Sequence, residues 1–449
     1  MGSAVVKTLD SHRQDAAYTL IMNKMLDTDS DRPRMDLSRL KLYTCPAVLD
    51  KLAAIVDLNL SHNNIKVLPA SFGVLACLEI LQLDHNRIEF IPKSIGDLQR
   101  LRVCSLNRNR CTALPMEMKN NGNLQQLYVD RNDLTTLPED LPKNLISLSC
   151  NRNHIEVLPD TITNLKALQF LDCSKNRISE LSHTMARMTR LQRFNMADNQ
   201  LIQLNTEPEG MYGMPSLTSL NLRGNSLLFL PEELGLLDTL TQLDISHNRT
   251  LEKLTPELGE LCDLETLSLN NCALRKLPEG LDDYTTELRA LDLSYNQLAR
   301  VHPCLGNILT LRTLWLTKNR LVTLPEALTC LTNLTALYID ENIMTDLPES
   351  MGNLCSLKIL SMRYNRLTAL PDSMGRCSKL SELHLANNKN ITHFPESYIE
   401  LKSLKAMSLD VGLLGSFSVE LLGWVTNLQE YEHRCCFDGR CFLRFDWFF

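Results

Sequence analysis

The sequence predicts an α/β solenoid in which short parallel strands line a concave face and short helices line the convex one. Two repeating features predict this fold. Asparagines recur after an LxxLxL pattern along most of the 449 residues, usually at intervals of 23 residues. Prolines such as Pro69, Pro92 and Pro115 recur shortly after them, where each strand would end and a convex return would start. Self-similarity at this period indicates stacked repeats, because each repeat buries its apolar side only against its neighbours.

Residues 1–52 precede the regular repeats and are expected to cap the array. Residues 4–26 place apolar side chains such as Tyr18, Ile21 and Met25 among polar ones, which predicts an amphipathic helix. The polar stretch DTDSDRPR would link this helix to an atypical first coil, LSRLKLYTC. Because the open end of a solenoid exposes a flat apolar surface, we expect this segment to cover it.

Residues 53–413 form the expected array of about sixteen repeats. In LxxLxL, alternate residues of a short strand point inward, so the leucines of successive coils stack into one core. The asparagines that follow are Asn63, Asn86, Asn109, Asn132, Asn153, Asn176, Asn199, Asn225, Asn248, Asn296, Asn319, Asn342, Asn365 and Asn388, with Cys272 and Gly412 in the same place in two further repeats. Their amides are expected to pair with backbone groups, each of which would cost about 1–3 kcal/mol if buried unpaired. The ladder is therefore predicted to be structural.

The repeat LxxLxLxxNxLxxLP resembles the leucine-rich repeat, and the resemblance runs from about residue 53 to residue 413. Its 23-residue form is similar to the intracellular class that includes Ras-binding signalling scaffolds and the plant Ras-group-related proteins. The resemblance implies a curved horseshoe and a protein-binding scaffold in signal transduction, with a small GTPase or a phosphatase as partner. The matched positions are core positions, so it implies no individual binding residues.

Two intervals depart from the period. The step from Asn132 to Asn153 is 21 residues, and LPEDLPKNL is too short for a full convex helix. The step from Asn199 to Asn225 is 26 residues, which predicts a bulged loop at 205–214. This loop is either a docking element or an insertion that the repeat tolerates.

Residues 414–449 break the pattern and form a predicted C-terminal cap. They contain SVELLGWVTNLQEYEH and end in CFLRFDWFF. Either these apolar residues cover the last coil or they form a peptide that binds a partner.

Composition excludes several classes of function. The net charge of −7 argues against a general nucleic-acid binder. No window approaches the roughly 18 apolar residues of a membrane helix, and the opening MGSAVVKTLD lacks the apolar core of a signal peptide. The fifteen cysteines include no CxxC pair, and Cys104, Cys150 and Cys173 fall at core positions, which is typical of a reducing compartment. We therefore expect a cytoplasmic protein, with the nucleus as the alternative, and no membrane insertion.

Motifs of catalysis are missing from the sequence. It contains no GxxxxGK[ST] phosphate loop, no HExxH, no GxSxG and no kinase signature. Histidines such as His62 and His85 precede ladder asparagines, so repetition explains their placement. The residues from His433 to Cys441 match no standard zinc spacing. We predict a non-enzymatic protein without catalytic residues, cofactor or metal.

An aromatic patch is predicted on the concave face of the later repeats. Trp315 lies at position 5 of LRTLWLTKN, where side chains alternate away from the leucine core, and Tyr338 lies at the same position one repeat later. The aromatic patch comprises Tyr295, Trp315, Lys318, Tyr338, Glu341, Arg363 and Tyr364. Exposed rings beside charged groups are typical of binding hot spots; the alternative is that the rings only pack on one another.

A basic edge is predicted in the earlier repeats. It comprises Arg108, Arg110, Arg131, Arg152, Lys175 and Arg177, four of which directly precede a ladder asparagine. Such a row could meet an acidic protein surface, a phosphorylated segment or inositol phosphates. The alternative is a solvated rim in which Asp130 and Asp172 balance the cations.

Two further classes of function remain alternatives to a signalling scaffold. One is a structural component of a cytoskeletal or ciliary assembly. The other is a targeting subunit of a ubiquitin ligase or a phosphatase, in which the repeats select substrates for an enzyme bound elsewhere.

Overall fold

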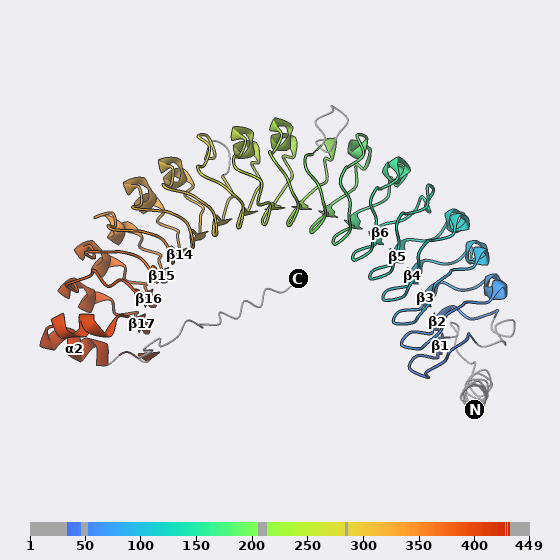
Figure 1. Cartoon of the computed structure of the whole chain (residues 1–449), viewed down its shortest axis with the longest axis horizontal. Helices are drawn as coiled ribbons and strands as arrows, with labels where there is room; N and C mark the ends of the chain where they lie inside the picture. Colours follow the sequence, from blue (N-terminus) through green and yellow to red (C-terminus); the bar gives the residue numbers. More distant parts are fainter. Residues whose placement is uncertain are drawn as a thin grey trace. The chain divides into compact units, whose positions relative to one another are not determined.

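The structure, a computed structural model, describes residues 34–45, 53–204, 213–282, 286–426, 428 and 430–431. These residues form two compact units, the first reaching Ser268 and the second starting at Leu269. The amphipathic helix predicted for residues 4–26, most of the loop at 205–214 and the segment from His433 to Cys441 lie outside the described residues. Figure 1 follows the chain by colour from the N-terminus in blue to the C-terminus in red.

Short parallel strands, one per coil, form the core-facing sheet of each unit. In the first unit they are β1 (Arg34–Asp36), β2 (Asp57–Asn59), β3 (Ile80–Gln82), β4 (Val103–Ser105), β5 (Gln126–Tyr128), β6 (Ser147–Ser149), β7 (Phe170–Asp172), β8 (Arg193–Asn195), β9 (Ser219–Asn221), β10 (Gln242–Asp244) and β11 (Thr266–Ser268). In the second they are β12 (Ala290–Asp292), β13 (Thr313–Trp315), β14 (Ala336–Tyr338), β15 (Ile359–Ser361), β16 (Glu382–His384), β17 (Ala406–Ser408) and β18 (Glu430–Tyr431). The central residue of most strands is leucine, and it lies beside the central residue of the next strand, as Leu58 lies beside Leu81 and Leu314 beside Leu337.

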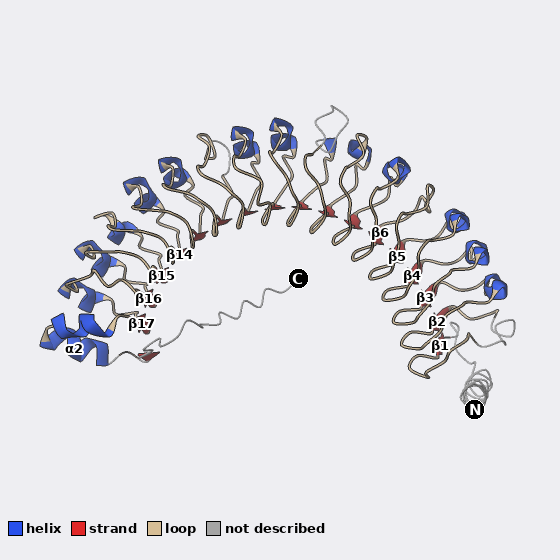
Figure 2. Cartoon of the chain, in the orientation of Figure 1, coloured by secondary structure: helices blue, strands red, loops and turns tan. Residues whose placement is uncertain are grey.

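Helices lie on the side of each unit opposite the strands (Figure 2). Nearly all are short 3-10 helices: η2 (Ala70–Val74), η3 (Lys93–Asp97), η4 (Met116–Asn120), η5 (Asp160–Asn164), η6 (Met185–Arg187), η8 (Glu232–Leu236) and η9 (Pro256–Glu260) in the first unit, and η10 (Pro303–Asn307), η11 (Glu326–Cys330), η12 (Met351–Asn353), η13 (Asp372–Arg376), η14 (Glu396–Glu400) and η15 (Val411–Ser416) in the second. Pro69, Pro92 and Pro115 directly precede their helices in extended backbone, as the sequence predicts. No helix lies between β5 and β6 in this fully described stretch, where the sequence is too short for one.

The asparagine ladder is confirmed as structural. The amide of Asn176 donates to the carbonyl of Cys150 in the preceding coil at 3.0 Å and to those of Cys173 and Ser174 in its own coil at 2.9 and 3.2 Å. Its Oδ1 accepts from the backbone N–H of Ile155 in the preceding coil at 3.0 Å. Each ladder asparagine therefore satisfies buried groups in two successive coils, which is why the coils keep one spacing.

The ladder changes at Gly412, which has no side-chain amide. Here the carboxylate of Asp410 accepts from the backbone N–H groups of Asn387 and Asn388 at 3.0 and 2.8 Å. Helix α2 (Val419–Thr426) follows η15, and its Leu421 and Val425 side chains are buried. The α2 helix lies in contact with η14, so apolar residues of the predicted cap pack on the last coils.

The cysteines predicted as small core residues lie in the core. Cys104, Cys150 and Cys173 are buried, and the sulfur atoms of Cys150 and Cys173 are 3.5 Å apart in neighbouring coils. The strand β1 belongs to the segment that the sequence assigns to the N-terminal cap, and it pairs in parallel with β2. The observed stack of coils confirms the predicted α/β solenoid class.

Candidate functional site

The residue before each ladder asparagine carries the candidate site in both units, and its backbone is left-handed. Its φ angle is 56° at Arg108, 54° at Arg131, 54° at Arg152, 56° at Lys175, 57° at Tyr295, 57° at Lys318, 54° at Glu341 and 55° at Tyr364. This conformation costs about 1–2 kcal/mol for residues other than glycine and asparagine. The backbone N–H still donates to the next coil, as Lys318 does to the carbonyl of Asp340 at 2.8 Å. The strand therefore ends in a tight turn, and the side chains of these residues lie on the strand-bearing face.

The rings of Trp315 and Tyr338 stack on each other. Both residues end their strands and lie opposite one another in the register of β13 and β14. Their centroids are 6.1 Å apart with an interplanar angle of 6°, and both side chains are half-buried. Leu314 and Leu337, on the other face of the same strands, are fully buried. Trp315 therefore belongs to the surface and not to the core.

Charged groups beside this stack are paired within the aromatic patch. The Lys318 ammonium lies 4.7 Å from the ring centroid of Tyr295 and 3.4 Å from a carboxylate oxygen of Glu341. Partial desolvation lowers the pKa of Lys318, but Glu341 and Tyr295 outweigh it, so this pKa is raised overall. Tyr295 and Tyr364 leave half of their surface exposed, 50% and 48%. The patch therefore presents aromatic surface beside a lysine that is already paired.

Arg363 extends the patch toward a buried carboxylate. Its backbone N–H donates to Asp340 Oδ1 at 2.7 Å, and the Ser361 hydroxyl donates to the same oxygen at 2.6 Å. Burial raises the pKa of Asp340, while Ser361 and Arg363 oppose that shift. The buried Nε of Arg363 has no hydrogen-bond partner among the described residues.

Sequence reasoning missed His384, which ends β16 directly beside Ser361 in the strand register. Burial, followed by the charge of Arg363, lowers the pKa of His384 against the opposing effect of Glu382. The signal was present in the repeat, because His384 occupies the same strand position as Trp315 and Tyr338.

The basic edge is exposed and largely unpaired. Arg108, Arg131 and Arg152 follow three consecutive strands, and none forms an ion pair within 4 Å in the described part of the chain. Desolvation, followed by the charges of Arg152 and Arg108, lowers the pKa of Arg131. Lys175 differs, because its ammonium lies 3.8 Å from a carboxylate oxygen of Asp198.

Carboxylates near the basic edge accept hydrogen bonds from the strands and form no ion pair with its arginines in the described residues. Asp130 accepts from the Ser149 hydroxyl at 2.6 Å and from the backbone N–H of Asn151 at 2.9 Å. Asp172 accepts from the backbone N–H of Ser174 at 2.9 Å.

Arg110 and Arg177 are exposed at the position after the ladder asparagine. The sequence offers no reason to include His62 and His85 in the basic edge, although they directly precede the ladder asparagine, as Arg108 does, in the two coils before it. Their rings stack with centroids 4.2 Å apart.

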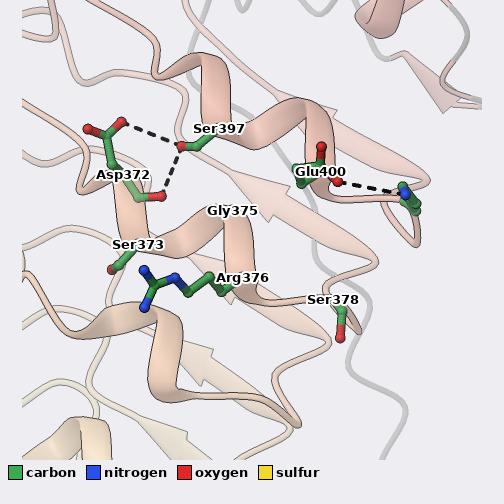
Figure 3. A pocket seen from close by; sticks show the side chains of 8 residues that line it. Asp372, Ser373, Gly375, Arg376, Ser378, Ser397 and Glu400 are labelled. Carbon is green, nitrogen blue, oxygen red and sulfur yellow. Dashed lines mark hydrogen bonds and ion pairs between the residues drawn. The ribbon is translucent and has the colours of Figure 1, made fainter.

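An open depression on the helix-bearing side of the second unit is the other candidate (Figure 3). It is lined by Asp372, Ser373, Gly375, Arg376, Ser378, Ser397, Glu400 and Lys402. The Ser397 hydroxyl donates to the Asp372 carbonyl at 2.9 Å, and Glu400 lies 3.7 Å from Lys402. Among the described residues, no group of three or more His, Cys, Asp or Glu side chains is placed to hold a metal ion. No helix in the described ranges combines the length and apolar character of a membrane span.

Comparison with known proteins identifies the family. A model of the leucine-rich repeat region matches residues 284–434, and a leucine-rich repeat model matches residues 216–237. The solved structure of a leucine-rich repeat protein from Leptospira interrogans is 30% identical with a TM-score of 0.78, covering 86% of this chain and 98% of that chain. The chain is a leucine-rich repeat protein.

More distant solved structures share the fold. A chain of the Toll–Spatzle complex from Drosophila is 22% identical with a TM-score of 0.70, covering 84% of this chain and 53% of that chain. The functional domain of InlJ from Listeria monocytogenes is 24% identical with a TM-score of 0.62, covering 76% and 70%. Disease resistance protein UNI from Arabidopsis thaliana is 36% identical over 80 residues, which is 18% of this chain and 9% of that protein.

Proposed function

We propose that this leucine-rich repeat protein is a non-enzymatic, cytoplasmic scaffold in signalling that docks a protein partner on its aromatic patch. The observation that carries the proposal is the half-exposed Trp315–Tyr338 stack between the exposed rings of Tyr295 and Tyr364. Tryptophan and tyrosine dominate binding hot spots because they bury a large area while few rotatable bonds become ordered. The leucine-rich repeat fold commonly supports protein interactions, and the described cysteines are all free thiols, as expected in a reducing compartment.

The patch is organised before any partner arrives. Trp315 and Tyr338 are fixed by strand register, and each strand is anchored by a fully buried leucine. Lys318 is already paired with Glu341, so a partner that covers the rings need not leave a lone charge buried. Preorganisation of this kind lowers the entropy lost on binding.

A small GTPase is the partner we propose first, on the resemblance of the repeat to Ras-binding scaffolds. The test measures binding of a purified Ras-type GTPase, loaded with GDP or with a non-hydrolysable GTP analogue, to the wild type, to Trp315→Ala and to Phe229→Ala. Phe229 is an exposed ring of the first unit and serves as the matched control. We expect Trp315→Ala to weaken binding by about 2 kcal/mol or more, and Phe229→Ala to leave it unchanged.

Two outcomes contradict parts of this proposal. Equal affinity of the wild type and Trp315→Ala for a bound partner would place docking away from the aromatic patch. If neither nucleotide form binds, the GTPase is rejected, and proteins captured from lysate by the wild type but not by Trp315→Ala identify the partner. Tubulin-associated proteins in that set would favour the structural alternative, and an enzyme core would favour the targeting alternative.

A further inference from the structure

Six consecutive coils of the first unit carry a basic or titratable side chain before the ladder asparagine. We call this set the cationic row: His62, His85, Arg108, Arg131, Arg152 and Lys175. Each backbone N–H in the row donates to a carbonyl of the next coil, as Arg108 does to Asp130 at 2.7 Å and Arg152 does to Ser174 at 2.8 Å. Neighbouring members are therefore held one strand apart, and the row spans about 24 Å at about 4.8 Å per step.

The cationic row opposes folding in two ways. Its backbones are left-handed, and its three central guanidiniums repel one another without an ion pair in the described residues. Nearby carboxylates relieve this repulsion only in part, because the charge of Asp130 raises the pKa of Arg131 but is outweighed by desolvation and by the neighbouring arginines. Asp84 accepts from the Ser105 hydroxyl at 2.5 Å and from the backbone N–H of Asn107 at 2.7 Å. Three neighbouring guanidiniums that are held in register without an ion pair in the described residues indicate a ligand of opposite charge.

The histidine pair gives the row a proton-dependent end. The rings of His62 and His85 are stacked with an interplanar angle of 16°. His85 faces His62 and Arg108 on the coils to either side, with Asp84 beside it and Arg131 one coil further on. Desolvation, followed by the neighbouring His62 and Arg108, lowers the pKa of His85. A bound anion acts in the opposite direction, because it favours the imidazolium form.

We propose that the cationic row is a second docking surface, which binds an extended Asp- and Glu-rich segment of a partner protein, and that His62 and His85 join the contact when protonated. When both histidines are protonated, the row offers one cation per coil in single file, and about 24 Å corresponds to about seven residues of extended chain. A polypeptide places discrete carboxylates along such a line. Nucleic acid fits less well, because Asp133 and Asp198 lie beside the row and the net charge of the chain is −7. This inference does not depend on the aromatic patch.

The test uses the full chain and a fluorescein-labelled octaglutamate peptide, with octaglutamine as the uncharged control. Binding is followed by fluorescence anisotropy at pH 7.5 in 50 mM and 200 mM salt. The test variant carries Arg108→Gln, Arg131→Gln and Arg152→Gln. The control carries Arg249→Gln, Arg300→Gln and Arg320→Gln, which remove three exposed charges outside the row. We expect the wild type and the control to bind octaglutamate more weakly at high salt, and the test variant to lose about tenfold in affinity.

A pH series separates the role of the histidines. On going from pH 7.5 to pH 5.5, the wild type should bind octaglutamate about threefold more tightly, and the double variant His62→Gln, His85→Gln should not. Melting temperatures measured alongside confirm that each variant is folded.

Two results would overturn the proposal, and a third would remove its histidine part. Equal affinity of the test variant and the charge-matched control would show that the row makes no specific contact. The full chain could instead bind a single-stranded oligonucleotide or phosphoinositide vesicles more tightly than octaglutamate, and lose that binding in the test variant. The ligand of the row would then be a nucleic acid or a membrane and not an acidic segment. An affinity that does not change with pH would remove the histidines from the site.

Discussion

The aromatic patch and the basic edge both place a cation directly before a ladder asparagine, as at Lys318 and Arg131. The cation is paired at Lys318 and, within the described part of the chain, unpaired at Arg131. In the second unit, Lys318 contacts both Tyr295 and Glu341, so the charge of this lysine is already paired before a partner binds. In the first unit, Arg108 and Arg131 stand on neighbouring coils without an ion pair in the described residues. The same left-handed turn holds Lys318, Arg108 and Arg131. The repeat therefore fixes spacing and direction, and the side chains alone decide whether a surface suits apolar or electrostatic recognition.

The largest expected effect separates core from surface within one strand of the aromatic patch. Leu314→Ala should lower the free energy of unfolding by about 2–5 kcal/mol, because Leu314 is fully buried and its removal leaves a cavity. Trp315→Ala should cost about 1 kcal/mol, since that ring is half-buried and loses mainly its contact with Tyr338. Urea unfolding of both variants checks this. A loss at Trp315 as large as that at Leu314 would mean that the ring serves the core.

The ladder should matter equally in both units. Asn176→Ala and Asn342→Ala should each lower the free energy of unfolding by about 2–3 kcal/mol, because each leaves several buried backbone groups without partners. Thermal melts followed by circular dichroism measure the loss. If either variant melts with the wild type, the ladder at that coil is not structural.

Substituting asparagine at the left-handed position should change stability differently at Arg152, which has no ion pair among the described residues, and at Lys318, which is paired. Arg152→Asn should raise the free energy of unfolding by about 0.5–1 kcal/mol, because asparagine tolerates this backbone and the change removes a repelling charge. Lys318→Asn gains the same backbone relief but loses the contacts to Tyr295 and Glu341, so its stability should change little. Parallel denaturant titrations decide this, and equal gains at both sites would show that the Lys318 contacts contribute nothing.

The smallest effect is a dependence on pH. The folded pKa values of His85 and His384 both lie below the unfolded value of about 6.5, so the unfolded chain binds more protons. The stability that these residues contribute is present above about pH 6.5 and is lost as the pH falls toward the folded pKa values. His384→Gln should flatten the fall between pH 7.5 and pH 5.5 more than His85→Gln, because His384 is the more buried of the two. Thermal melts at several pH values test which variant has the larger effect. If stability fell more steeply with falling pH in either variant than in the wild type, that histidine would stabilise the fold at low pH, contrary to this prediction.

The repeat frame, the ladder and the Trp315–Tyr338 stack were predictable because they depend on the spacing of apolar residues and asparagines. The left-handed turn was not, although Gly224, Asn271 and Asn387 hold that position in three coils and favour such a backbone. About half of the coils place arginine, lysine or tyrosine there, so tertiary stacking overrides the local preference of the residue. His384 and the histidine pair were missed for a related reason, since their meaning comes from the neighbouring coil and not from their own repeat.

The ladder also gives the molecule a polarity. Asn176 holds the carbonyl of Cys150 and the amide of Ile155, which both belong to the coil before it. Each coil is thus clasped by its successor. Peeling the chain from its C-terminal side would leave the backbone groups of the last remaining coil without their asparagine, whereas peeling from the N-terminal side would leave an asparagine without its backbone partners. The two ends of such a stack should therefore resist mechanical unfolding to different degrees.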